Sequence, residues 1–327
     1  MHWGLRIATD SNAGIGHAVR CRSLARAQGG AVTLFADPDD AGAVRTGPWA
    51  GKIIQEASRE SAELAREALQ ARYIDALLFD SYWVSEDEIG AASQSGYVAV
   101  IRDGGDYGAE TVTIDPRPGA LGTRRCLAGT TYMPLPERFS KLHAAAKQQG
   151  VDETQPLRVL VTFGQRDSNE RTLCAVEGLH LAASHFWASV IIGQDYQGGD
   201  AVLAAVNGDK RFEILRNPDD LAGMFDQFDL SIGAPGVSQY ERACCGLPTI
   251  LVSQNERQEP LVAAWADCGA AIAVSAKSAQ IAAAIDSLDQ DRSSLAAVRN
   301  AGLNSVDGLG ARRLARDLNQ FVQEAVR

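Results

Sequence analysis

The sequence predicts an α/β protein made of two doubly wound domains, and three observations support this prediction. Short apolar strands alternate with amphipathic helices along the whole chain, as in parallel sheets built from βαβ units. The 327 residues are too many for one ordinary core and suit two domains of about 150 residues. The alternation pauses at the polar, Pro-containing stretch 150–156 and then restarts. We therefore expect Rossmann-like domains at 1–150 and 157–327, with an interdomain cleft for the ligand.

In the first half, short apolar runs predict six strands with helices between them, and a further helix precedes the linker. The strands are expected at 5–9, 31–36, 52–55, 74–80, 97–103 and 111–114, and the helices at 17–29, 58–71, 85–94 and 136–148. The second half repeats the pattern, with strands at 157–163, 188–192, 212–215, 230–232, 249–252 and 270–274. A last helix, near 308–325, has no strand after it and could pack back on the first domain.

The composition is typical of a globular protein, with 46% hydrophobic and 22% charged residues. The net charge of −10 argues against nonspecific binding of nucleic acid and against an anionic membrane surface. The chain begins directly with a strand and has no apolar run near the roughly 20 residues of a membrane span, so we expect a cytoplasmic protein without a signal peptide. The six cysteines lack zinc-ligand spacing, which favours buried free thiols. We expect a protein that needs no metal and no cofactor, and we favour a monomer over an oligomer.

The most informative segment joins the first strand to the first helix. Gly14 and Gly16 allow a tight turn that a ligand can approach closely, and the helix that follows offers free N–H groups to an anion. His17, in the first turn of that helix, would place a base beside the anion, and the positive helix end favours its neutral form. The alternative is a structural His17 that caps the helix or bonds to a nearby carboxylate. The segment predicts a phosphate-bearing substrate beside a proton acceptor.

A second segment with this character follows the strand predicted at 230–232. The N–H groups of Gly236, Val237 and Ser238 would suit a diphosphate at the start of a helix. One turn further on, Glu241 could accept two hydrogen bonds from a ribose diol. An equally weighted alternative is a capping box of Ser238 with Glu241, which would stabilise the helix and nothing more.

Two further loops of the second half lie at the same predicted sheet edge. The stretch 162–169, with Gly164 and Asp167, follows the first strand of this half, and the polar loop 253–258 follows a buried strand. Three such loops on one edge predict a nucleotide site. A dinucleotide site for NAD is the weaker interpretation, because Val19 stands where the fingerprint requires its third glycine.

The residues of these loops resemble a known family, the UDP-sugar hydrolases of pseudaminic acid biosynthesis, the pathway of flagellin glycosylation. The resemblance covers most of the chain and is strongest in four stretches. These are Arg6, Asp10-Ser11, Gly14-Ile15-Gly16-His17 and Arg20-Cys21; Asp80-Ser81-Tyr82; Gly129 and Tyr132 with Arg138-Phe139; and Gly233 to Arg242 with Gly246-Leu247-Pro248. The chain departs from the family pattern at Gln165, Arg166, Pro235 and Arg257. The fold that the resemblance implies is similar to that of GT-B glycosyltransferases.

The resemblance implies a hydrolase that removes UDP from UDP-2,4-diacetamido-2,4,6-trideoxy-β-L-altropyranose, with His17 as the catalytic base and Tyr82 as an active-site residue. The implied UDP-sugar site consists of Asp10, Gly14, Gly16, Gly164, Asp167, Gly236, Val237, Ser238, Glu241 and Gln258. UDP departs without needing a proton, so a positioned water, a base and positive potential at the phosphate suffice. Two alternatives stay open: a glycosyltransferase of the same fold, in which an acceptor hydroxyl replaces water, and a catalytically silent binding protein.

Overall fold

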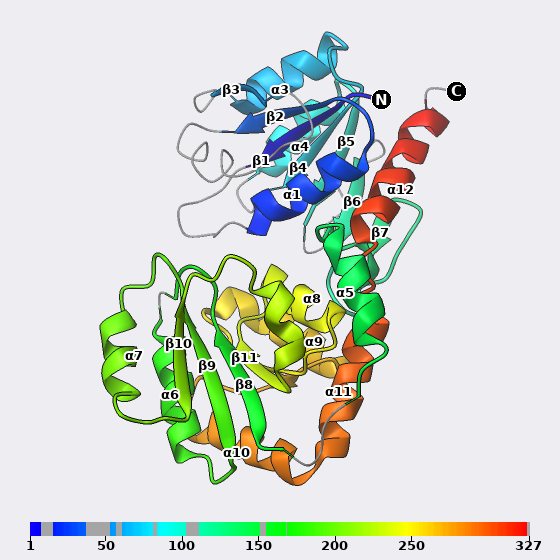
Figure 1. The fold of residues 1–327 in the computed structure, drawn as a ribbon. Coiled ribbons are helices and arrows are strands. Elements are labelled where there is room, and N and C mark those ends of the chain that lie inside the picture. Colours follow the sequence, from blue (N-terminus) through cyan, green and yellow to red (C-terminus); the bar gives the residue numbers. More distant parts are fainter. Residues whose placement is uncertain are drawn as a thin grey trace. The chain divides into compact units, whose positions relative to one another are not determined.

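The computed structural model describes residues 1–7, 16–36, 53–56, 61–80, 84–102, 111–150, 155–167 and 169–325. The chain divides into two compact units, and each has its own sheet and helices (Figure 1). The first unit is Met1–Glu137 together with Gly308–Arg327, and the second unit is Arg138–Asp307. The chain therefore leaves the first unit once and returns to it at its C-terminal end.

The first unit is built around a seven-stranded sheet whose strand pairs are parallel. Its strands are β1 (Trp3–Ile7), β2 (Val32–Ala36), β3 (Ile53–Glu56), β4 (Ala76–Asp80), β5 (Tyr97–Ile101), β6 (Thr111–Asp115) and β7 (Cys126–Ala128). Its helices are α1 (Gly16–Ala27), α3 (Ser61–Gln70), α4 (Glu86–Ser93), the 3-10 helix η1 (Thr130–Tyr132) and α12 (Gly310–Ala325). The order β3-β2-β1-β4-β5-β6-β7 reverses direction between β1 and β4. Ligands of such sheets bind at the carboxyl ends of the strands beside this switch point.

All six strands predicted in the first half are present, with ends shifted by up to two residues, whereas β7 was not predicted. Only Leu127 of this three-residue strand is buried, so no apolar run marks it in the sequence. The strand exists because its backbone pairs with β6 at the sheet edge.

Helices cover both faces of the first sheet. On one face, Leu24 of α1 and Leu314, Leu318 and Val322 of α12 join the buried side chains of β1 and its neighbours. On the other face, α3 and α4 pack against β4 and β5. Each fully buried side chain of this kind stabilises the fold by about 1.5–3 kcal/mol. Helix α12 is therefore part of the core of the first unit.

Polar contacts fix the position of α12 within this unit. The Tyr132 hydroxyl donates to Asp317 Oδ2 at 2.8 Å, and Trp3 Nε1 donates to Asn319 Oδ1 at 2.9 Å. At the start of the helix, a Cβ on Gly310 would collide with the backbone carbonyl of Met133. Only glycine allows the helix to begin this close to η1.

The second unit contains a six-stranded sheet, also with parallel pairs, in the order β10-β9-β8-β11-β12-β13. Its strands are β8 (Leu157–Thr162), β9 (Phe186–Ile192), β10 (Phe212–Arg216), β11 (Leu230–Gly233), β12 (Thr249–Leu251) and β13 (Ile272–Ala273). Its helices are α5 (Arg138–Ala146), α6 (Arg171–Leu181), α7 (Gly199–Ala205), η2 (Ala222–Gln227), α8 (Val237–Cys244), η3 (Glu256–Gln258), α9 (Glu259–Asp267), α10 (Ser278–Gln290) and α11 (Arg292–Ser305). The six strands match the six predicted ones. Helix α5 precedes the expected linker at 150–156 and belongs to this second unit.

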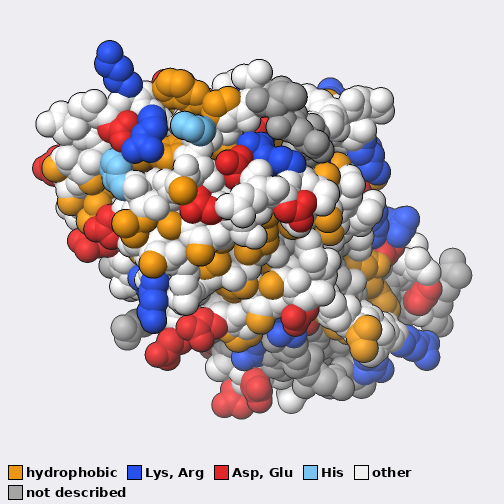
Figure 2. Space-filling view, turned by 90° about the horizontal axis from the view of Figure 1, so that it is seen from below, with side chains coloured by type: hydrophobic (Ala, Val, Ile, Leu, Met, Phe, Trp, Pro, Cys, Tyr) orange, Lys and Arg blue, Asp and Glu red, His pale blue; other side chains and the backbone are white. Residues whose placement is uncertain are grey.

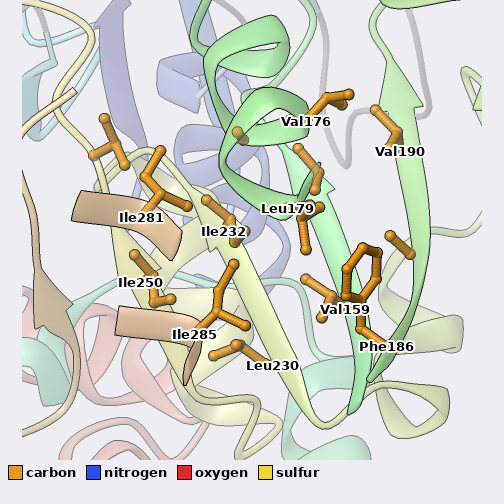
Figure 3. Packing of buried hydrophobic residues seen from close by; sticks show 14 of the residues in the cluster. Val159, Val176, Leu179, Phe186, Val190, Leu230, Ile232, Ile250, Ile281 and Ile285 are labelled. Carbon is orange, nitrogen blue, oxygen red and sulfur yellow. The ribbon is translucent and has the colours of Figure 1, made fainter. Parts of the chain in front are cut away.

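Much of the core of the second unit lies between its sheet and the helices α6 and α10. Figure 3 shows Val176 and Leu179 of α6, and Ile281 and Ile285 of α10, directed toward the strands. The strand side chains that meet them include Val159, Phe186, Val190, Leu230, Ile232 and Ile250. The switch point of this sheet lies between β8 and β11, which brings the loops after Thr162 and Gly233 to one edge.

The surface and the cysteines bear on the classes of partner considered above. On the face seen in Figure 2, acidic and basic side chains are interspersed without an extended basic area. No helix within the described ranges is long and apolar enough to cross a membrane.

The six cysteines are free, but only Cys21 and Cys244 are buried, so the expected burial holds for two of the six. Within the same ranges, no cluster of His, Cys, Asp and Glu side chains could hold a metal ion.

Candidate active site

In the first unit, the switch point brings His17 against Asp80. His17 lies in the first turn of α1, and Asp80 is the last residue of β4, paired in register with Ile7 of β1. His17 Nδ1 is 2.7 Å from Asp80 Oδ1, and both side chains are buried, with 3% and 0% of their surfaces exposed. Arg20 Nη2 lies 2.9 Å from the same Nδ1, but Arg20 also donates to Asp80, so we assign the Nδ1 proton to the contact with the Asp80 carboxylate, the charged acceptor.

Arg20 completes this arrangement from the next turn of α1. Its Nε donates to Asp80 Oδ2 at 2.6 Å, and its Nη2 donates to Asp80 Oδ1. Burial alone would raise the pKa of the Asp80 carboxyl, but Arg20 and His17 together hold that pKa well below its usual range. Asp80 is therefore a carboxylate at neutral pH, and it fixes the imidazole through Nδ1. With Nδ1 engaged by the carboxylate, proton transfer by this imidazole would go through its other ring nitrogen, Nε2.

The structure thus contains the bond to a carboxylate that was the structural alternative for His17. This bond is compatible with a catalytic role. Sequence analysis did not identify Asp80 and Arg20 as partners of His17, since Asp80 is 63 residues away along the chain. The signal that could have found Asp80 is a carboxylate at the end of a wholly apolar strand. Gly16 begins α1, while Asp10, Gly14 and Tyr82 lie outside the described residues.

In the second unit, α8 begins at the turn that follows β11. Gly236 is its N-cap residue, and among the described residues no side-chain cap hydrogen bond is present at this helix start. The capping box of Ser238 with Glu241 is therefore wrong, because the helix starts one residue before Ser238. Gly236 is exposed and Val237 and Ser238 are half-buried, so an uncapped helix N-terminus stands at this sheet edge.

Glu241 lies one turn into α8, half-buried. Burial raises the pKa of its carboxyl to about 7, and the charges of Arg138 and Arg242 offset part of this effect. Within the part of the chain that the structure describes, its carboxylate makes no hydrogen bond that would stabilise the ionised form. The carboxylate oxygens of Glu241 could therefore accept hydrogen bonds from a ligand.

The loops after β8 and β12 are tied to each other by hydrogen bonds. Arg171 Nε donates to Ser253 O at 3.0 Å, and Gln254 Nε2 donates to Phe163 O at 2.7 Å. Gln258 Oε1 accepts a hydrogen bond from the amide of Gln254 at 2.9 Å, which closes the second loop on itself. The side-chain oxygen of Gln258, a predicted ligand residue, thus shapes this loop.

Asp167 and Gly164 shape the loop after β8. The buried Asp167 carboxylate accepts hydrogen bonds from the amides of Arg171 at 2.9 Å and Thr172 at 2.6 Å, the first two residues of α6. Asp167 was predicted as a ligand residue, and the structure gives it this capping role, which sequence analysis missed. Gly164 has a φ of +85°, a conformation that favours glycine.

No family model matches the chain. The spore coat polysaccharide biosynthesis protein SpsG of Bacillus subtilis is 23% identical to it over 284 residues, which cover 83% of each protein. Among solved structures, MurG of Acinetobacter baumannii has a TM-score of 0.71 at 15% identity, covering 98% of this chain and 100% of MurG. CalG4, the calicheamicin glycosyltransferase, has a TM-score of 0.69 at 12% identity, covering 99% of both chains. Anabaena HepE in complex with UDP-glucose has a TM-score of 0.57 at 11% identity, covering 99% of both. These similarities confirm the expected fold, two Rossmann-like domains of the GT-B type.

Proposed function

We propose that the chain is an enzyme of polysaccharide biosynthesis that acts on a UDP-sugar, and that it is a hydrolase which releases UDP. The observation that carries the proposal is the buried pair of His17 and Asp80, reinforced by Arg20, at the switch point of the first sheet. A base held in one orientation by a carboxylate is what activation of a water molecule requires. The name of SpsG, a polysaccharide biosynthesis protein, and the UDP-glucose bound to HepE support the substrate class.

In the proposed reaction, the second unit holds the nucleotide. The amides of Gly236, Val237 and Ser238 would bind the diphosphate, and Glu241 would accept hydrogen bonds from the ribose. Gly164, Asp167 and Gln258 would act by shaping the loops around it. The residue set proposed for the UDP-sugar in the first unit remains Asp10, Gly14 and Gly16.

The chemical step needs one proton acceptor. His17 Nε2 would take a proton from a water that attacks the anomeric carbon, and the bond from that carbon to the UDP oxygen would break. UDP then leaves with the bonding electrons, and Asp80 stabilises the imidazolium that forms. Tyr82 would orient the water or a sugar substituent. The proposed substrate is UDP-2,4-diacetamido-2,4,6-trideoxy-β-L-altropyranose, on the resemblance of the motifs around His17 and Gly236.

A glycosyltransferase is the second candidate, and it is favoured by the similarity to CalG4. The same base would then activate an acceptor hydroxyl. A fold alone cannot separate the two reactions, because the same architecture hosts both. The discriminating observation is the release of UDP in the absence of any acceptor.

The first experiment measures UDP release from the proposed substrate without acceptor or metal, together with UDP binding by calorimetry. We expect release by the wild type, and a loss of about 10²- to 10⁴-fold in kcat for His17→Ala with UDP binding retained. His185→Ala, at an exposed histidine of the second unit, is the control and should keep full activity. If the wild type binds UDP but releases none, the hydrolase is ruled out for this sugar and the transferase gains support.

A further inference from the structure

Arg242 is a fully buried arginine beside the turn that leads into α8. None of its surface is exposed, and its Nη2 donates to Ala234 O at 2.7 Å and to Gln239 Oε1 at 3.1 Å. A Cβ on Gly233 would lie 2.8 Å from Arg242 Nη1, so the backbone of the turn passes directly against the guanidinium. Arg242 thus lies against the first two residues of the Gly233–Gly236 turn.

These contacts make the turn rigid just before the first amides of α8. The guanidinium fixes the carbonyl of Ala234, and the next residue, Pro235, has a locked φ and no N–H. Gly236 follows as the N-cap residue without a side-chain cap. A turn held in this way keeps the amides at 236–238 in one arrangement before any ligand arrives, which lowers the entropic cost of binding.

Among the residues that the structure describes, no carboxylate lies at hydrogen-bonding distance from Arg242, although the charge of Glu241 acts on it from further away. Its hydrogen bonds go to a backbone carbonyl and a side-chain amide, both neutral, within the described part of the chain. Burial lowers the pKa of its guanidinium only to about 10, so the group stays charged at neutral pH. By contrast, the buried Arg20 of the first unit is paired with Asp80. A buried cation without an ion pair is costly, and a bound anion nearby would offset that cost.

We propose that Arg242 is the positioning residue of the diphosphate site: it holds the Gly233–Gly236 turn in shape and supplies positive potential behind the N-terminus of α8. The inference rests on the proposed function, because it takes the anion to be the diphosphate of UDP. In this proposal, Arg242 contacts the turn and acts on the ligand only through its positive potential. Its effect on affinity therefore depends on how many negative charges the ligand carries.

The test compares two variants with two ligands. Arg242→Lys keeps the charge, and Arg242→Gln keeps a neutral donor for Ala234 O but loses the charge. Calorimetry with UDP and with uridine is done on each variant and on the wild type. We expect Arg242→Gln to lose about 10- to 100-fold in affinity for UDP while its affinity for uridine stays unchanged, and Arg242→Lys to stay much closer to the wild type.

Equal losses for UDP and uridine, or equal losses in both variants, would overturn the inference and leave Arg242 a purely structural residue. If Arg242→Gln does not fold, the wild type still decides. The Nε–H NMR signal of Arg242 should then shift when UDP binds and stay in place when uridine binds, and an identical response to both contradicts the inference. A wild type that binds uridine but not UDP also overturns it, whereas one that binds neither overturns the proposed function itself.

Discussion

At the scale of single residues, Asp80 organises the buried polar cluster at the switch point of the first sheet. One buried carboxylate accepts hydrogen bonds from His17, Arg20 and the Cys21 thiol, which donates to Oδ2 at 3.1 Å. Burial and the neighbouring Asp80 charge raise the pKa of Cys21, so this thiol stays protonated. Because all three partners come from one face of α1, the carboxylate also fixes that helix on the sheet.

Replacing Asp80 with Asn should destabilise the first unit by about 3–5 kcal/mol at pH 7, because Arg20 would stay buried without its partner. The pKa of Asp80 is lower in the folded than in the unfolded chain, so the stabilisation is present above its unfolded pKa and is lost as pH falls below about 4. Hydrogen exchange of α1 and β4 as a function of pH measures the effect. Asp220→Asn, at an exposed pair with Arg138, should cost less than about 1 kcal/mol. A similar cost in both variants would contradict the role given to Asp80.

Glu241 presents the opposite case, because its pKa is raised from 4.5 to about 7 in the folded chain. The wild type therefore loses stability as pH rises from about 4.5 through 7, where the folded chain must ionise a half-buried carboxyl. We expect Glu241→Gln to be more stable than the wild type by about 1–3 kcal/mol at pH 8 and equally stable at pH 4. Urea unfolding at the two pH values, followed by hydrogen exchange of α8, checks this. The same variant should bind UDP more weakly, and a gain in stability at both pH values would contradict the assignment.

At the scale of elements, the loops after β8 and β9 depend on a close approach of two backbones. A Cβ on Gly193, just after β9, would collide with Gly164 O and lie 2.5 Å from Gln165 O. The glycine therefore allows the loop after β8 to lie where Asp167 can cap α6. The sequence shows a glycine here but cannot show which loop passes over it.

Gly193→Ala should displace this loop, cost about 1–3 kcal/mol of stability and weaken UDP binding. Thermal unfolding and calorimetry with UDP measure both effects. Gly90→Ala is the matched control, because nothing lies within 4 Å of a Cβ there and alanine suits the helix interior of α4 better. It should stabilise the first unit by roughly 0.5–1 kcal/mol. Unchanged UDP affinity in Gly193→Ala would separate this loop from the nucleotide site.

At the scale of the whole molecule, the sequence predicted the two sheets because their strands are short apolar runs bounded by polar residues. It could not predict β7, whose pairing depends on the neighbouring strand, or the pair of Arg20 with Asp80, which joins distant parts of the chain. The place of His17 in the first turn of α1 could be predicted from local motifs alone, and its role as a base stays a prediction. The N-cap of α8 could not be predicted in this way, because Gly236 and Ser238 are both favoured N-cap residues and only the backbone of Val237 and Ser238 decides between them.

Removing residues 308–327 should expose the core of the first unit, where α12 contributes Leu314, Leu318 and Val322. We expect hydrogen exchange of β1 and β2 to become fast, while the β8 and β9 amides of the second unit stay protected and UDP still binds. Gln320→Ala, at an exposed position of the same helix, should change neither. If β1 and β2 keep their protection without α12, that helix is dispensable for the first unit.

The return of α12 also has a consequence for the order in which a ribosome could produce a folded protein. Residues of β1 are synthesised long before the helix that covers them, because α12 follows the entire second unit in the chain. At about 5–20 residues per second, the unfinished first unit waits on the order of ten seconds or more with an apolar face open. We therefore expect the second unit to complete its fold before the first unit, the reverse of the usual N-terminal-first order. During that interval, we expect the uncovered apolar face of the first sheet to be the part of the nascent chain that most needs a chaperone.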